Sequence, residues 1–374
     1  MKNKAIMERP FEYLRRSGDG QPFPEETVRN WYIARAYVLD KLKDIAFGPG
    51  DAGSIHALVS SDSPLMLAVV RQLALSAHFI NYRERDIFGN LICKNRTLVT
   101  LVSGRGAQEA AAELQKEEYL GNLMQHCKYT VFGETVNADS YLDVELEIVP
   151  EAPESFDLVF SEEEALAFVA SKAPEEVFSI DTRKAVLAGR VYELGAVIDN
   201  LPAEDIHSAK RYMFALDTFQ FKLLGKKPAP MINDAKWQKS QLTVKYGLSN
   251  IFCADCFESR ARGIRKYCDE SGVGEREAWE TNNEALSYSE HNRWVAERLI
   301  LGFRQPGKEE RMFYETLYAR KKAACVKMLK NNEEDPAHVD LCSCLDLRRS
   351  DPDNFKYDSF LLLAIPLILK KLGL

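Results

Sequence analysis

The sequence predicts an α/β protein in which a domain with a mostly parallel sheet is followed by a mainly α-helical region. Between residues 51 and 230, short apolar runs alternate with segments of helical periodicity, which is the pattern of a parallel sheet covered by helices. Residues 231–374 carry helical periodicity through most of their length. A chain of 374 residues also exceeds the usual size of one hydrophobic core, so we expect more than one domain.

The first 50 residues are expected to form an N-terminal helical arm. Apolar side chains recur at helical spacing over residues 25–46, and the run Phe47-Gly48-Pro49-Gly50 ends the helix. A helix of this kind packs on a neighbouring domain or on a second subunit. A homo-oligomer formed through this arm or through the sheet domain is therefore one expectation.

The remaining elements follow from runs and periods along the chain. Pro64 suits the first turn of a helix that follows a short apolar strand, and Gly and Pro between residues 225 and 230 indicate the end of the sheet domain. Strands are expected at residues 55–59, 78–82, 97–102, 141–149, 158–160 and 177–180. Helices are expected at residues 64–76, 107–120, 162–170, 182–194, 204–223, 252–267, 283–301, 309–329 and 360–371.

Charge and composition narrow the classes of partner. The chain carries 49 Lys and Arg against 56 Asp and Glu, a net charge of -7 that gives no general attraction to DNA, RNA or anionic lipid. No secretory leader is evident, and no apolar run reaches the roughly 18 residues that a membrane span needs. We therefore expect a cytoplasmic protein without nucleic-acid or membrane partners, in which the apolar run at residues 360–369 is a buried helix.

A turn between the first strand and the first helix of the sheet domain sits where a dinucleotide fold holds its phosphates. Its residues are Ser61, Asp62 and Ser63. Ser61 and Ser63 stand at the first two positions that would normally be glycine, and Met66 stands at the third. The stretch from Val59 to Leu65, with Gln72-Leu-Ala-Leu-Ser-Ala-His-Phe79, resembles the Rossmann-like domain of bacterial TrkA-type regulators. The resemblance implies NAD or another nucleotide as a bound regulator.

Further candidate groups for that nucleotide site lie after the next two expected strands. Asn81 ends the second, where dinucleotide folds place a group on the ribose, and Ser103 and Arg105 follow the third before a helix. An arginine and exposed N–H groups at a helix start suit an anion. The alternatives are a solvated turn and a Rossmann-like domain that binds no ligand.

A second cluster of candidate binding residues lies in the helical region. On a helix, Glu290, Trp294 and Arg298 share one stripe and His291 begins the adjacent one. Together with Gly302-Phe303, Arg304 and His338, this order of residues resembles the RyR domain, a helical repeat first described in ryanodine receptors and also found in bacteria. The resemblance covers about residues 280–374 and implies a binding module, not a reaction.

The same residues also have structural explanations. Trp294 suits a flat ligand, Glu290 and His291 suit polar groups, and the arginines suit phosphate. In the structural alternative, Trp294 is core, Ser287-x-x-Glu290 is a capping box at a helix start, and Gly302 ends the helix. The sequence leaves both readings open.

The sequence contains no recognisable catalytic motif. It lacks a nucleophile elbow, a Walker loop and a His-Glu-x-x-His zinc helix, and Cys253-x-x-Cys256 with Cys342-x-Cys344 is an unusual zinc spacing, so buried thiols are the favoured reading. We expect no catalytic residues and no metal site. The leading expectation is a non-catalytic sensor of a nucleotide or nucleotide-derived small molecule in a bacterial stress or antiphage pathway. An enzyme acting on a nucleotide or NAD, and a protein-interaction scaffold, are the alternatives.

Overall fold

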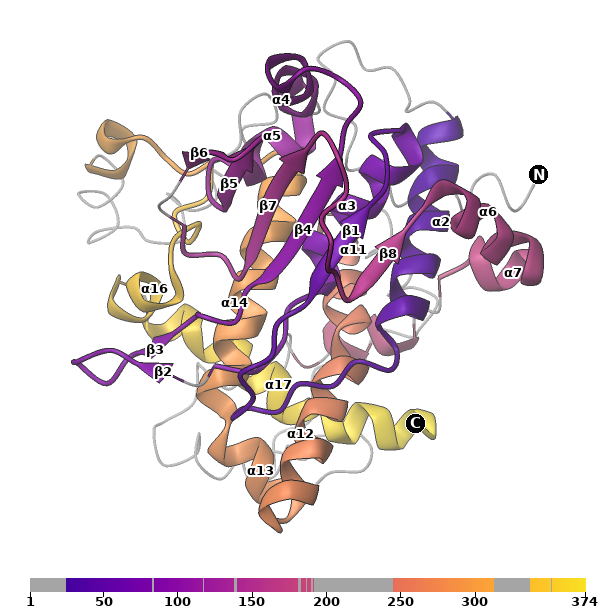
Figure 1. The fold of residues 1–374 in the computed structure, drawn as a ribbon. Helices are drawn as coiled ribbons and strands as arrows, with labels where there is room; N and C mark the ends of the chain where they lie inside the picture. Colours follow the sequence, from indigo (N-terminus) through magenta and orange to yellow (C-terminus); the bar gives the residue numbers. More distant parts are fainter. Residues whose placement is uncertain are drawn as a thin grey trace.

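The computed structural model describes residues 25–82, 84–116, 118–137, 140–180, 183–185, 187–189, 191, 245–312, 337–350 and 352–374 (Figure 1). The helix expected at residues 204–223, the linker at 225–230 and most of the helix expected at 309–329 lie outside these residues.

Six strands form the main sheet, in the order β6-β5-β7-β4-β1-β8. Neighbouring strands are parallel, except for β5 and β6, which form an antiparallel hairpin at one edge. The strands are β1 (His56–Val59), β4 (Thr97–Val102), β5 (Lys128–Val131), β6 (Glu134–Asn137), β7 (Val144–Val149) and β8 (Leu158–Phe160). The mostly parallel sheet with helices is consistent with the α/β Rossmann-like region that the sequence predicts.

Helices lie behind and beside this sheet, and most of the described residues after position 244 are helical. Figure 1 shows α3, α11 and α14 behind the sheet, with α2 beside β8 and α17 crossing below. The helices are α2 (Glu25–Leu42), α3 (Pro64–Ser76), α4 (Ala107–Lys116), α5 (Glu118–Met124), α6 (Glu162–Ser171), α7 (Pro174–Val177), α11 (Lys245–Asp255), α12 (Phe257–Ser271), α13 (Glu275–Thr281), α14 (Asn283–Ile300), α16 (Cys344–Ser350) and α17 (Pro352–Leu372). None of the described helices is long and apolar enough to cross a membrane.

The two faces of the sheet differ in polarity because side chains alternate along each strand. Val59, Val99 and Ile148 belong to one face and are buried in the core. The opposite face carries a polar row: His56 Nε2 lies 2.8 Å from Thr100 Oγ1, and the Thr100 hydroxyl donates to Glu147 Oε2 at 3.1 Å. Only the apolar face can therefore anchor α3 and α14 through hydrophobic burial.

The start of α3 follows from its sequence. Ser63 is the N-cap, and its Oγ accepts a long hydrogen bond of 3.4 Å from Met66 N, while Pro64 occupies the first turn. Apart from Pro64 and Arg71, the residues of α3 are buried, including the polar Gln72 and Ser76. This helix is therefore enclosed between the sheet on one side and helices on the other.

The N-terminal arm packs on both halves of the chain. Tyr37 donates to Glu164 Oε2 of α6 at 2.7 Å, and Arg35 Nε donates to Asp255 Oδ2 of α11 at 2.9 Å. The hydrophobic core is continuous from Val28 in α2 to Leu369 in α17. The arm is thus an integral part of the fold in this chain.

Two expected strands are wrong. Residues 78–82 form no strand, although all five are buried. Val177 ends the short helix α7, and residues 178–180 follow it without strand pairing. A hairpin that the sequence reading missed, β2 (Glu84–Arg85) with β3 (Leu91–Ile92), lies between the irregular segment and β4. In the main sheet, the next strand along the chain after β1 is therefore β4, and the two strands are neighbours.

Candidate ligand-binding site

The serine turn after β1 meets the loop after β4 at the carboxyl edge of the sheet. Asp62 Oδ2 accepts a hydrogen bond from Ser103 Oγ at 2.8 Å and lies 3.1 Å from Arg105 Nε. Ser63 is used as the cap of α3, and Ser61 is part of the same turn. The carboxylate of Asp62 therefore takes the polar groups that a ligand phosphate would need at this edge, and it would repel that phosphate.

Asn81 lies elsewhere, because residues 78–82 follow the end of α3 and lie near the amino ends of the strands. Its Nδ2 donates to the carbonyl oxygen of Gly53, which precedes β1, and its own carbonyl accepts from Asn95 Nδ2 at 2.8 Å. The expectation that Asn81 ends a second strand beside the serine turn is wrong. The other five residues of the proposed nucleotide site do lie together.

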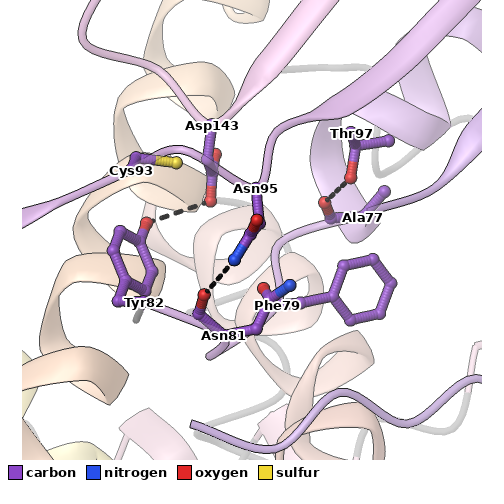
Figure 2. A pocket seen from close by; sticks show the side chains of 8 residues that line it. All are labelled: Ala77, Phe79, Asn81, Tyr82, Cys93, Asn95, Thr97 and Asp143. Carbon is purple, nitrogen blue, oxygen red and sulfur yellow. Dashed lines mark hydrogen bonds between the residues drawn. The ribbon is translucent and has the colours of Figure 1, made fainter. Parts of the chain in front are cut away.

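A small cavity at this amino edge is shown in Figure 2. It has a volume of about 10 Å³ and is lined by polar and apolar side chains, including Asn81, Tyr82, Cys93, Asn95 and Asp143. A cavity of this size has room for about one water molecule. It is therefore too small to be a substrate site.

Buried hydrogen bonds next to the cavity connect the sheet to α14. His78 Nδ1 lies 2.6 Å from Asp143 Oδ1, and its Nε2 donates to the carbonyl oxygen of Ala74 at 2.7 Å. The Tyr82 hydroxyl donates to Asp143 Oδ2 at 3.2 Å and accepts from Asn292 Nδ2 at 2.7 Å (Figure 2). Both ring nitrogens of His78 are used in structural contacts, so the pair is not arranged as an open acid–base site.

The aromatic residues of the helical region do come together. The Trp294 ring stacks on His291 at a centroid distance of 5.9 Å and meets the edge of His338 at 4.8 Å, and His338 also contacts Phe303 at 6.3 Å. His338 N donates to the carbonyl oxygen of Arg304, whose guanidinium pairs with Glu310. His338 therefore lies against the end of α14 and its aromatic residues.

The chain's own arginine fills the cation position of this cluster. The Arg298 guanidinium lies 5.5 Å from the Trp294 ring and 5.4 Å from the Phe303 ring, and its side chain is almost fully buried. His291 is also buried; burial lowers the pKa of its imidazole to about 4, and its Nε2 bonds to the carbonyl oxygen of Cys342. Arg298 and His291 thus pack against the indole, while Trp294 itself is half-buried.

Glu290 belongs to a fully buried charge network, which reaches the cluster through the 3.5 Å contact of Glu297 with Arg298. Arg293 donates to both Glu290 carboxylate oxygens at 2.9 Å and to Glu297 Oε2 at 2.7 Å, and Arg260 Nη2 of α12 lies 2.7 Å from Glu290 Oε2. Burial alone would raise the pKa of the Glu290 carboxyl, but Arg293 and Arg260 lower it to about 2. Ion pairs between charged side chains therefore join α12 to α14.

The two ends of α14 test two of the structural explanations for this motif, the capping box and the terminal glycine. Helix α14 begins at Asn283, so Ser287 lies inside it and donates to the carbonyl oxygen of Asn283; the capping-box reading of Ser287 and Glu290 is wrong. Gly302 has φ 79°, and Phe303 N donates to the carbonyl oxygen of Arg298 at 2.9 Å. The reading of Gly302 as the glycine that ends the helix is confirmed.

The cysteine pair of α11 and its end is also packed. Cys253 and Cys256 are free thiols with almost no exposure. Burial raises the pKa of both, to about 11 for Cys256. Thiols that stay protonated near neutral pH are poor nucleophiles and poor metal ligands.

A larger pocket, which the sequence reading did not find, lies where α2 meets α11 and α12. Its volume is about 250 Å³, and its apolar wall consists of Leu39, Leu42, Ile251 and Ala254. Pockets that hold drug-sized ligands begin at about 300 Å³, so this pocket suits a smaller molecule. Its residues come from positions 35 to 262 of the chain, which is why no local motif reveals it.

Cations outnumber anions around this pocket. Four basic side chains, Arg35, Lys43, Lys184 and Arg262, line it together with the two acidic ones Asp255 and Glu258. Their formal sum is about +2, in a chain whose net charge is -7. Asp40, outside the lining, pairs with Lys43 at 3.1 Å, so the pocket retains one cation more than its carboxylate partners in an otherwise acidic chain.

The two partly buried arginines of the pocket are each held in place by a defined partner. Asp255 engages Arg35 through both carboxylate oxygens, at 2.9 Å from Nε and 2.5 Å from Nη2. Arg262 donates to the carbonyl oxygens of Leu42 and Ile45 at 3.0 and 3.2 Å, closing the end of α2. Within the described residues, Nη1 of both arginines makes no hydrogen bond, so each guanidinium retains a donor edge.

No family model, curated protein or solved structure matches this chain. The pocket geometry and the sequence pattern therefore carry the functional argument.

Proposed function

We propose that this protein is a non-catalytic regulator that binds a small anionic, nucleotide-derived molecule in the pocket between α2, α11 and α12. The observation that carries the proposal is the set of four cations around a volume of about 250 Å³ in an acidic chain. Guanidinium groups with a free donor edge favour phosphate and carboxylate groups. The RyR-like and TrkA-type resemblances support the same class of protein, a bacterial sensor.

The position of the pocket supports a regulatory role. It is bounded by the N-terminal arm on one side and by the helical region on the other, and the Arg35–Asp255 pair bridges the two. A ligand that binds both sides would stabilise one relative pose of the arm and the helices. The binding free energy would thereby be coupled to a surface that another subunit or protein can read.

The arrangement of acids and bases supports binding rather than catalysis. His291 is buried against a carbonyl, His78 uses both ring nitrogens in structural contacts, and burial raises the pKa of the Cys253 and Cys256 thiols. None of these groups lies among the residues that line the pocket. The carboxylates that do line the pocket, Asp255 and Glu258, are engaged in ion pairs with Arg35 and Lys184, so a bound molecule would meet paired charges and apolar walls.

Thermal unfolding in the presence of AMP, ADP-ribose, NAD and ATP tests the proposal. A ligand present at 100 times its dissociation constant stabilises the folded chain by about 2.7 kcal/mol. We expect at least one of these molecules to raise the midpoint, and Arg262→Gln or Lys43→Gln to reduce its affinity by about tenfold to a hundredfold, the range expected for one hydrogen bond to a charged group. Arg276→Gln, an exposed residue on α13, is the matched control.

Three outcomes would contradict the proposal. The first is that no compound shifts the midpoint, and the second is that the Arg276 control weakens binding as much as the pocket variants. The third is chemical turnover of the bound compound by the purified protein, measured by chromatography, which would indicate an enzyme.

A further inference from the structure

The β2–β3 hairpin carries the two most exposed large apolar side chains among the described residues. Ile87 is 93% exposed and Phe88 is 78% exposed, and both lie in the loop between the two strands. Figure 1 shows the hairpin projecting from the body of the protein, across the view from α2. Single apolar residues are common on protein surfaces, but two neighbours at a projecting end form an apolar patch of the kind that marks interaction sites. We call Ile87 and Phe88 the hairpin tip.

The loop that presents this tip is preformed by hydrogen bonds. Asp86 Oδ1 accepts from the backbone nitrogens of Phe88 and Asn90, both at 2.8 Å. Asp86 N donates to the carbonyl oxygen of Asn90 at 2.9 Å, and Gly89 takes a φ of 81° that closes the turn. Arg85 Nη1 donates to the carbonyl oxygen of Gly89 at 2.7 Å. A loop that is already ordered loses little conformational entropy when its tip enters a partner.

The charges of the hairpin do not favour a membrane surface as that partner. Residues 84–94 contain two acidic and two basic residues, so their formal charges sum to zero. Lys94 pairs with Glu84, and Arg85 pairs with Glu284. A neutral segment gains no attraction to anionic lipid, and two side chains insert less hydrocarbon than a myristoyl chain, which alone binds membranes only marginally. A concave apolar site on a protein fits the tip better.

The pocket between α2, α11 and α12 has the shape and lining that such a tip requires. Its aliphatic residues Leu42, Ile251 and Ala254 are buried, whereas Glu258 and Lys43 are about half exposed. Its volume of about 250 Å³ exceeds the roughly 150 Å³ in which an apolar cavity holds benzene, the ring of a phenylalanine side chain. An apolar centre surrounded by polar groups is also the arrangement of a protein-interface hot spot.

We propose that the hairpin tip of one copy inserts Phe88 into the α2–α11–α12 pocket of a second copy. Two convex tips that met each other would leave most of each side chain in water, whereas the pocket can enclose the ring. Tip and pocket are different surfaces of the chain, so the contact is heterologous, and each pair keeps one unused tip and one unused pocket for further copies. The contact goes beyond the proposed function, because a small molecule in the same pocket would exclude the tip and release the second copy.

Sedimentation velocity of the full chain over a range of protein concentrations tests this contact. The average mass of the unmodified protein should rise with concentration, and Phe88→Ser should weaken the association by about tenfold to a hundredfold, the contribution of one buried phenylalanine. Leu39→Gln, at a half-buried position of the pocket wall, should weaken it as well, whereas Leu39→Met keeps the wall apolar and should not. Leu166→Ser, at a 46% exposed position on α6, is the matched control. Equal thermal midpoints would show that each variant is folded.

A mixture of the Phe88→Ser and Leu39→Gln variants separates this contact from other modes of association. The first variant has an intact pocket and the second an intact tip. At a concentration at which each variant alone is monomeric, the mixture should form pairs of two chains and nothing larger, with the affinity of the unmodified contact.

Four outcomes would overturn the inference. They are an unmodified protein that stays monomeric at every concentration, an association that Phe88→Ser leaves unchanged, an association that Leu39→Gln leaves unchanged, and a mixture that stays monomeric. None of them decides the proposed function. Ligand binding is measured separately by thermal unfolding of Phe88→Ser, in which the pocket is intact and the tip is removed.

Discussion

Glu290→Gln should destabilise this protein more than any exposed charge substitution on the same helix. The Glu290 carboxylate is fully buried and neutralises Arg293 and Arg260, whose guanidinium groups are also fully buried. Glutamine keeps the size of the side chain and removes its charge, which leaves a surplus of buried cations beside Glu297. Removing one partner of a buried ion pair costs about 3–5 kcal/mol.

Urea unfolding at neutral pH measures this loss, with linear extrapolation to water. The control is Glu284→Gln on the first turn of α14, because Glu284 pairs with Arg85 and Arg348, whose side chains are 51% and 49% exposed. Exposed pairs contribute about 0–1 kcal/mol, so the control should lose little. Equal losses in the two variants would refute the assignment of Glu290 to a structural charge network and would reopen it as a ligand group.

Two further predictions follow from buried residues. The pKa of His291 is lowered to about 4 from its ordinary 6.5, so the unfolded chain takes up this proton first as pH falls, and stability should decline between pH 6.5 and 4 by about 1.4 kcal/mol per unit at most. Unfolding free energies from pH 7 to 4.5 should fall less steeply in His291→Gln; parallel curves would disprove the neutral buried state. Gly263→Ala should cost about 1–3 kcal/mol, since its Cβ would lie 2.9 Å from Ile80 Cδ1 and closer still to the carbonyl oxygen of Phe47. Gly104→Ala, whose Cβ would meet nothing within 4 Å, is the control in the same denaturation assay, and a loss as small as the control's would contradict the predicted clash.

Elements with a strong local pattern could be predicted from the sequence. The helix at residues 64–76 and the strand at residues 97–102 have the predicted limits, because a proline at the first turn and a β-branched run determine them locally. The hairpin of β5 and β6 was missed, although Phe132 and Gly133 form its turn with φ 48° and 83°. A glycine between two alternating runs was the signal that could have found it.

The segment at residues 78–82 shows why an apolar run is not always a strand. Its neighbour Ala77 and its own His78 and Asn81 offer carbonyl oxygens that accept from Thr97 Oγ1, Ser289 Oγ and Asn95 Nδ2. These side chains replace the strand partner, and Ser289 is 211 positions away from His78. Local periodicity contains no information about such donors.

The surroundings of the candidate site residues depend on tertiary structure in a related way. The sequence correctly groups Trp294, Phe303 and His338, and it groups Asp62 with Ser103 and Arg105. It does not show that Arg298 and Asp62 fill those clusters from within the chain, because that depends on side-chain directions in the folded state. The cationic pocket depends on helices about 220 residues apart, which only the tertiary structure brings together.

The ion pair between Arg35 and Asp255 also sets an order of events during synthesis. The two residues are 220 positions apart, so the ribosome completes α2 long before its partner on α11 exists. At about 5–20 residues per second, the delay is roughly 10–40 s, far longer than the microseconds in which a helix forms. During this interval α2 can pack on α3 and the growing sheet. Arg35 on its outer side remains without Asp255 until the last third of the chain is synthesised.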